Sequence, residues 1–250
     1  MKTEYKFRIL EKTTQAYGWW YGKGNKRIEF LWSKKNNKKQ SSRLLVFLHG
    51  HGSSAIRSLG FSLVGIRSGC DVLSISLPGY GYSDGPADYC GPRSVERITS
   101  FLIVFLKHYS YTKKFLWGIS RGAITAGLLA SKAPKLFDGI ILQAGAYDFD
   151  RFYKKIQDSI LKNNIRKEAG ISVKAFKERS SLKTLDRYVG PLLILYGKQD
   201  QADSMQARLL YERRKRAGLP VMIKTYPNEF HRIPLAKIEP AIKKFVEKSG

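Results

Sequence analysis

The sequence predicts an α/β protein with a mostly parallel central sheet and helices on both faces of that sheet. Short apolar runs alternate with helical patterns from residue 44 to the end of the chain, which is the signature of this class. Most of these runs end in glycine-rich loops. The 250 residues, 43% of them hydrophobic, are enough for one domain over 1–250 with a substantial core.

The first half of the chain carries the elements that open the sheet. Residues 3–12 and 27–32 have apolar residues at alternate positions, so we expect two strands that form an antiparallel edge. Glycines break the link between them. Residues 44–48 are continuously apolar, as in a strand buried on both faces. The pattern then predicts a helix, a strand and a second helix over 56–68, 71–77 and 93–108.

The second half continues the alternation, with one interruption. Residues 149–187 contain two helical stretches, 151–168 and 172–179, without a strand between them. We expect this segment to be a short helical cap insertion over the carboxyl ends of the strands, where α/β sheets bind ligands. The other elements expected here are strands over 114–117, 136–143, 191–196 and 220–226, and helices over 123–133, 203–217 and 234–248.

The pentapeptide Gly118-Ile119-Ser120-Arg121-Gly122 lies between an expected strand and an expected helix. G-x-S-x-G in this position is typical of a nucleophile elbow, a strained turn that holds a serine oxygen clear of the sheet. The two glycines allow the strand and the helix to approach closely. The motif therefore makes Ser120 the candidate nucleophile.

Serine needs a base, usually a histidine that a carboxylate orients. His231 follows the strand expected over 220–226, downstream of Ser120. Asp200 follows an earlier strand, and Asp148 is a second candidate acid. Asp200 is favoured because Gly197 permits the turn that aims its carboxylate at the histidine. We expect Asp203 to cap the following helix.

An oxyanion hole needs two backbone N–H groups that point to the developing negative charge. One is expected from Arg121, the residue after the nucleophile. The other is expected from the loop His49-Gly50-His51-Gly52, where His51 has the best position. An ordinary glycine turn is the competing interpretation of this loop.

These motifs together resemble the α/β-hydrolase superfamily over nearly the whole chain. The stretch from Ser181 to His231 is similar to the catalytic domain of prolyl-oligopeptidase-like hydrolases, in which a Pro-Leu-Leu strand also leads to the acid. The motifs that carry the resemblance are His49–Gly52, Leu77–Gly85, Gly118–Gly122, Gly197–Asp200 and Glu229–His231.

The resemblance implies a serine hydrolase that cleaves a carboxylic ester, a thioester or a small amide through an acyl-enzyme. It implies a small acyl substrate and no metal or organic cofactor. Two departures place esterase or thioesterase chemistry ahead of peptidase chemistry: no β-propeller precedes the motifs, and Ala123 stands where those enzymes double the glycine. The same fold also accommodates catalytically silent binding proteins and lyases, and the motifs leave both interpretations open.

The formal net charge is +25, from 45 Lys+Arg against 20 Asp+Glu. Such a balance suggests nucleic acid, an anionic surface or an acidic substrate. No nucleic-acid module is evident, so we expect no specific nucleic-acid partner; a lysine-rich surface is the simpler explanation. Segment 149–187 nevertheless favours anionic substrates if it covers the pocket, because it carries Arg151, Lys154, Lys155, Lys162, Arg166, Lys167, Lys174, Lys177 and Arg179.

The remaining expectations concern location. The first six residues contain no apolar stretch of a secretory signal, and no run is long enough to span a membrane. The two cysteines, Cys70 and Cys90, are expected to be free thiols in a reducing compartment, although the sequence also permits a single bridge between them. We therefore expect a cytoplasmic protein.

Overall fold

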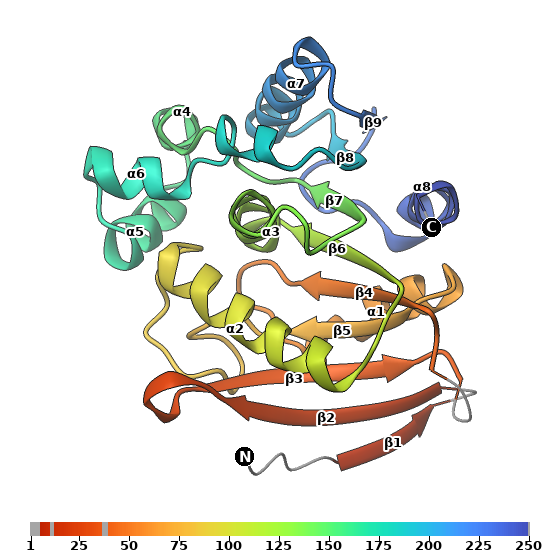
Figure 1. Cartoon of the computed structure of the whole chain (residues 1–250). Coiled ribbons are helices and arrows are strands. Elements are labelled where there is room, and N and C mark those ends of the chain that lie inside the picture. Colours follow the sequence, from red (N-terminus) through yellow and green to blue (C-terminus); the bar gives the residue numbers. More distant parts are fainter. Residues whose placement is uncertain (1–5, 11–12, 37–39, 250) are drawn as a thin grey trace.

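The computed structural model describes residues 6–10, 13–36 and 40–249. Nine strands of this part form one sheet in the order β1-β2-β3-β5-β4-β6-β7-β8-β9 (Figure 1). The strands are β1 Lys6–Leu10, β2 Thr13–Tyr21, β3 Arg27–Lys34, β4 Arg43–Leu48, β5 Asp71–Ile75, β6 Lys113–Ile119, β7 Gly139–Gln143, β8 Leu192–Gly197 and β9 Val221–Tyr226.

The sheet is mostly parallel, as the sequence predicts. Strand β4 lies between β5 and β6 and is parallel to both, and β6 to β9 continue the parallel part. Strands β1, β2 and β3 are antiparallel to their neighbours and form the predicted antiparallel edge. Consecutive parallel strands place their carboxyl ends at one edge of the sheet, and the loops that follow them meet there.

The antiparallel edge has one strand more than the sequence pattern predicts. Strand β2 occupies the stretch that the pattern assigns to a glycine-broken link, and Gly18 lies opposite Phe30 in the β2–β3 ladder. Ala16 and Trp20 are buried on the core side of β2, so the period of two extends through Gly18. Of the strand expected over 3–12, residues 3–5 and 11–12 lie outside the described residues.

The helices cover both faces of the sheet, which confirms the predicted layers. Helices α2, α3 and α7 contribute to the core on one face, and α1 and α8 pack on the other. Alternate residues of β4 point to the two cores: Leu44 and Val46 into one, Leu45 and Phe47 into the other. The helices are α1 Leu59–Arg67, α2 Pro92–His108, α3 Arg121–Lys132, α7 Gln201–Arg216 and α8 Leu235–Lys248.

The segment 149–187 contains three short α-helices instead of the two expected stretches: α4 Phe149–Lys155, α5 Ser159–Glu168 and α6 Val173–Arg179. The helix expected over 151–168 is broken at Asp158, whose carboxylate accepts hydrogen bonds from the backbone amides of Ile160 (2.8 Å) and Leu161 (3.0 Å). An aspartate in this position starts a new helix. Figure 1 shows α4, α5 and α6 grouped at one end of the sheet.

A third, smaller core joins these three helices to the rest of the protein. Phe149, Ile165 and Phe176 pack with Tyr89 and Ile124, which come from the loop before α2 and from α3. The segment is therefore fixed on the sheet domain by buried apolar contacts.

The structure bears on the two cysteines and on the lengths of the helices. Cys70 and Cys90 are both buried and free, so a bridge between them is excluded. Within the described ranges, no helix is both long and apolar enough to cross a membrane.

Candidate active site

Ser120 lies at the turn between β6 and α3. Its backbone has φ 54° and ψ −118°, a conformation that non-glycine residues rarely adopt. A Cβ atom at Gly122 would overlap the carbonyl groups of Leu48 and His49, and one at Gly118 would overlap Gly122 itself. The glycines of the pentapeptide are thus required for the close approach that makes this turn.

His231 comes from the loop between β9 and α8. Its Nε2 atom lies 3.0 Å from the Oγ atom of Ser120, although the two residues are 111 positions apart in the chain. Parallel strands bring these loops to the same edge of the sheet. The distance is that of a hydrogen bond between a serine nucleophile and its base.

Two carboxylates lie beside the other nitrogen of the His231 ring. Asp203 Oδ2 is 2.7 Å from Nδ1, and Asp200 Oδ2 is 3.5 Å from it. The Asp203 side chain is 4% exposed, against 24% for Asp200. At these distances Asp203, and not Asp200, makes the direct hydrogen bond to the imidazole.

The helix cap also differs from the sequence expectation. Asp200 is the N-cap of α7 and accepts a hydrogen bond of 3.0 Å from the Asp203 backbone amide. The expectation that Asp203 caps this helix is therefore wrong. Asp200 precedes the helix with extended backbone, so its carboxylate faces the free amides. Asp203 in the first turn points to His231. Asp148, the other candidate acid, caps α4.

The two carboxylates dominate the electrostatics of the imidazole. Burial lowers the pKa of His231, but the interactions with Asp200 and Asp203 outweigh burial and raise it to about 10. Burial raises the pKa of Asp203, while the interaction with His231 opposes that effect. Burial also raises the pKa of Asp200. Its contacts with His231 and with the α7 amides outweigh burial and bring the pKa of Asp200 below the usual value. The two carboxylates therefore favour the protonated, cationic form of the His231 ring.

The loop after β4 passes next to Ser120. A Cβ atom at Gly50 would lie 3.3 Å from the Ser120 Cβ, so only a residue without a side chain fits easily there. His49 is 1% exposed, and its Nε2 accepts the Leu77 amide at 3.0 Å. Its Nδ1 therefore carries the proton and donates to the Gly50 carbonyl at 2.7 Å. Burial lowers the pKa of His49 to about 4, which keeps the ring neutral.

The candidate oxyanion donors come from two sides of Ser120. Arg121 is the first residue of α3, where a backbone amide has no partner inside the helix and carries partial positive charge. His51 belongs to the loop after β4. Both residues line the cavity into which Ser120 opens.

This cavity has a volume of about 900 Å³ and lies between the sheet edge and the segment 149–187. The Ser120, His231, Asp200 and Asp203 side chains form part of its wall. A further part of the wall belongs to α4, α5 and the link between them, and includes Phe152, Lys155, Ile156, Asp158, Ile160, Leu161 and Asn164. The site is thus a cleft in which apolar side chains such as Phe152, Ile156 and Leu161 lie beside the polar groups of both parts of the wall.

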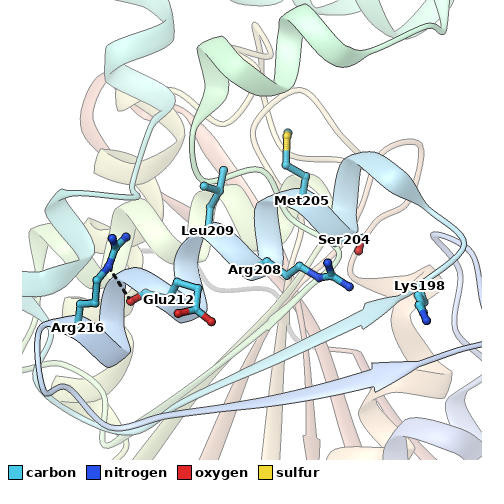
Figure 2. Close-up of a pocket in the computed structure, with 7 residues that line it drawn as sticks. All are labelled: Lys198, Ser204, Met205, Arg208, Leu209, Glu212 and Arg216. Atoms are coloured by element: carbon cyan, nitrogen blue, oxygen red, sulfur yellow. Dashed lines mark hydrogen bonds between the residues drawn. The ribbon is translucent and has the colours of Figure 1, made fainter.

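A second hollow of about 590 Å³ lies along the outer side of α7 (Figure 2). Cationic side chains line it, among them Lys198, Arg208 and Arg216, and the Arg216 Nε donates to the Glu212 carbonyl (Figure 2). The residues that line this hollow do not include Ser120, His231, Asp200 or Asp203. The larger cavity, which Ser120 and His231 line, is therefore the candidate active site.

Over the described ranges, one group of His, Cys, Asp and Glu side chains is compact enough to hold a metal ion. It consists of Asp200, Asp203 and His231, whose ligand atoms lie within 4.8 Å of one another. Two of these atoms, His231 Nδ1 and Asp203 Oδ2, already share a hydrogen bond, which an acid–base role of His231 requires.

Sequence reasoning misses three residues of this site. The direct partner of His231 is Asp203, which the sequence pattern presents as a cap because it lies inside the expected helix. Tyr80 and Glu168 contact the side chain of Arg121, and the sequence pattern assigns neither of them a role in the site. The Tyr80 loop is visible as Leu77–Gly85, but its contact with Arg121 depends on the fold.

Comparisons with known proteins show similarity in both sequence and structure. A model of the prolyl oligopeptidase family matches residues 100–245. A search of curated proteins found no match. Among solved structures, the Pyrococcus furiosus esterase Pf2001 is 17% identical with a TM-score of 0.70, and the match covers 99% of this chain and 94% of that one.

Two further structures are similar over nearly the whole chain. The acetyl xylan esterase from Paenibacillus sp. R4 has 15% identity and a TM-score of 0.76, with 98% of this chain and 88% of that chain covered. An S-formylglutathione hydrolase from Agrobacterium tumefaciens has 14% identity and a TM-score of 0.74, with coverage of 100% and 98%. These likenesses show the α/β-hydrolase fold, and because the family match spans more than half of the sequence, the chain belongs to the prolyl oligopeptidase family.

Proposed function

We propose that the protein is a serine hydrolase that cleaves a carboxylic ester, a thioester or a small amide. One observation carries this proposal: Ser120 Oγ lies 3.0 Å from His231 Nε2, and Asp203 lies 2.7 Å from Nδ1 of the same ring. A serine in this arrangement loses its proton to the imidazole as it attacks a carbonyl carbon.

In the proposed mechanism, Ser120 Oγ forms a bond to the acyl carbon while His231 Nε2 takes the proton. The carbonyl oxygen becomes an oxyanion, which the backbone amides of His51 and Arg121 stabilise. The bond to the leaving group then breaks, and the imidazolium donates its proton to that group. Water attacks the acyl-enzyme by the same route in reverse and releases the acid and free Ser120.

In this mechanism the two aspartates have different roles. Asp203 holds the ring by its direct hydrogen bond, so that Nδ1 carries a proton and Nε2 faces Ser120. Asp200, which the sequence favours as the acid, lies 3.5 Å from Nδ1 and adds negative charge beside the imidazolium. We therefore propose Asp203 as the principal acid and Asp200 as its support.

The segment 149–187 supports an ester or thioester substrate of moderate size. It contributes apolar side chains such as Phe152, Ile156 and Leu161 to the cavity wall. We propose that it is a cap that receives the apolar part of the acyl or leaving group. The structural neighbours include esterases and an S-formylglutathione hydrolase, which agrees with this chemistry.

Membership of the prolyl oligopeptidase family supports peptidase activity as a second candidate. The two candidates differ in the leaving group, which is an alcohol or thiol for an esterase and an amine for a peptidase. Hydrolysis of 4-nitrophenyl esters of increasing acyl length, measured beside aminoacyl 4-nitroanilides, separates them. Anilide rates that exceed the ester rates would reverse the order proposed here.

The test of the nucleophile is labelling with a fluorophosphonate probe, which reacts with activated serines. We expect the wild type and Ser204→Ala to be labelled, since Ser204 lines only the hollow on α7. We expect Ser120→Ala to lose both labelling and ester hydrolysis. Labelling that persists in Ser120→Ala would place the nucleophile elsewhere, and an unlabelled wild type would favour a catalytically silent protein.

A further inference from the structure

Tyr80 lies in the loop after β5, and its hydroxyl contacts residues of two segments next to Ser120, the loop after β4 and the start of α3. Its hydroxyl is 3.1 Å from Nδ1 of His51, in the loop after β4. The same hydroxyl accepts a hydrogen bond from Nη1 of Arg121, at the start of α3. One phenol oxygen therefore connects the two residues whose backbone amides are the proposed oxyanion donors.

The Arg121 side of this connection is fixed. The Arg121 side chain is 3% exposed, and Nη1 also pairs with Glu168 of α5 at 2.7 Å. Its guanidinium carbon lies 3.9 Å from the centre of the Tyr89 ring, a cation–π contact. The Tyr80 hydroxyl is thus held by a group that is itself anchored to the segment 149–187.

The His51 side depends much more on Tyr80. His51 is exposed to solvent in a loop whose next residue, Gly52, has a positive φ of 69°. The Tyr80 hydroxyl is a hydrogen-bond partner of the His51 ring, and the two rings also make an edge contact with centroids 5.9 Å apart. Loss of the hydroxyl would release the His51 ring from Arg121 but would leave the ring contact.

The proton positions on this bridge follow from the donor and acceptor types. Arginine only donates, so the phenol oxygen accepts from Arg121 and its own proton is available to His51 Nδ1. Burial raises the pKa of Tyr80 to about 12, so the phenol keeps its proton at neutral pH. Although His51 is exposed overall, partial desolvation of its ring, with Arg121 nearby, lowers its pKa and favours the neutral ring that can accept a hydrogen bond.

We propose that Tyr80 is a positioning residue, whose hydroxyl holds the His51 and Arg121 sides of the oxyanion hole at a fixed separation. This inference rests on the proposed function. An oxyanion hole works only if its donors are held within roughly 0.5 Å of the productive geometry. Loss of a direct donor costs about 10²–10³ in kcat, and we expect loss of a support to cost about 10-fold.

The experiment compares Tyr80→Phe with the matched control Tyr82→Phe, whose side chain is in the same loop and 58% exposed. We measure kcat and KM on 4-nitrophenyl acetate and the inhibition constant of phenylboronic acid, which forms a tetrahedral adduct on an active serine. For Tyr80→Phe we expect kcat to fall about 10-fold, KM to stay within about 2-fold, and the boronic acid to bind more weakly by about the same factor as kcat. Tyr82→Phe should match the wild type in all three.

A double-mutant cycle with His51→Ala adds a second measurement. If the Tyr80 hydroxyl acts through His51, Tyr80→Phe should lower kcat much less in the His51→Ala background than in the wild type. If circular dichroism shows that Tyr80→Phe does not fold, Glu168→Gln replaces it, because Glu168 anchors the Arg121 side of the bridge. We expect Glu168→Gln to lower kcat and boronic acid affinity together, by a smaller factor than Tyr80→Phe, and to leave KM unchanged.

The outcomes are separable from those of the proposed function. A wild type that hydrolyses the ester, with kcat and boronic acid affinity unchanged in Tyr80→Phe, overturns the positioning role alone. A raised KM with unchanged kcat in Tyr80→Phe assigns Tyr80 to substrate binding and overturns the positioning role. Additive effects of Tyr80→Phe and His51→Ala on kcat overturn it as well. A wild type that neither hydrolyses the ester nor reacts with the fluorophosphonate overturns the proposed function, and this inference with it.

Discussion

At the scale of single residues, the two carboxylates beside His231 make different contributions. Asp203 is buried and 2.7 Å from Nδ1, while Asp200 is 3.5 Å away and caps α7. We expect Asp203→Asn to lose about 10³–10⁴ in kcat, because an amide at this position favours the wrong tautomer of the ring. Asp200→Asn should lose about 10-fold or less, and Asp148→Asn should resemble the wild type.

The measurement is kcat for one alkyl ester, taken at the pH where each variant is most active. Circular dichroism checks that the variants are folded. A larger loss in Asp200→Asn than in Asp203→Asn would return the principal role to Asp200, as the sequence pattern indicates.

The same pair of carboxylates determines the pH dependence. In the proposed mechanism only neutral His231 can accept the Ser120 proton, and the pKa of His231 is raised to about 10. The value of kcat/KM should therefore rise with pH until the pH exceeds that pKa. In Asp200→Asn one negative charge is gone, so the imidazolium is less stable and the rise should move about one to three pH units lower.

The pH profile of kcat/KM for a neutral alkyl ester, followed by titration of the released acid, checks this prediction. Spontaneous hydrolysis is subtracted at each pH. A profile that reaches its plateau below pH 7 in the wild type, or an unchanged profile in Asp200→Asn, would show that the carboxylates do not control the base.

At the scale of elements, the turn between β6 and α3 depends on Gly122. A Cβ atom there would overlap the Leu48 and His49 carbonyl groups, which are backbone and have little freedom to move. We expect Gly122→Ala to lower the free energy of unfolding by about 1–3 kcal/mol, the usual cost of overpacking, and to reduce activity by moving Ser120.

Gly60→Ala is the matched control, because the added atom would meet only the end of the Leu235 side chain. Urea denaturation of both variants gives the comparison, and Gly60→Ala should change stability by less than about 1 kcal/mol. A Gly122→Ala variant as stable and as active as the wild type would contradict the close approach described here.

The sequence predicts those elements whose pattern is local. Continuous apolar runs such as 44–48 identify the buried parallel strands, and the G-x-S-x-G turn locates Ser120. The pattern fails in two places for different reasons. Gly18 does not interrupt β2, because the tertiary pairing with β3 continues through it. The helix expected over 151–168 is divided by the Asp158 cap, a local signal that the helical periodicity does not register.

The candidate site shows the same limit. The loops that bear Ser120 and His231 follow strand ends, so their meeting could be predicted from the parallel topology. The choice between Asp200 and Asp203 could not, because it depends on which carboxylate turns to the α7 amides. The contact of Tyr80 with Arg121 joins positions 41 residues apart through side chains alone, and no spacing in the sequence indicates it.

At the scale of the whole molecule, the net charge of +25 gives the protein a positive long-range field. Such a field attracts anions over a distance set by salt, about 30 Å at 0.01 M and about 8 Å at 0.15 M. If the proposed substrate class includes anionic esters, their kcat/KM should exceed that of neutral esters at low salt, and the advantage should shrink as salt is added.

The test compares 4-nitrophenyl butyrate with the 4-nitrophenyl monoester of succinic acid over a salt series. Lys155, an exposed cation in the cavity wall, separates local from global charge. If the field of the whole protein acts, Lys155→Gln should retain most of the salt dependence, because it removes one charge from a total of +25. If Lys155 binds the carboxylate directly, the variant should lose the preference for the anionic ester at every salt concentration. Equal rates for the two esters, without salt dependence, would show that the basic charge of this protein has no part in substrate selection.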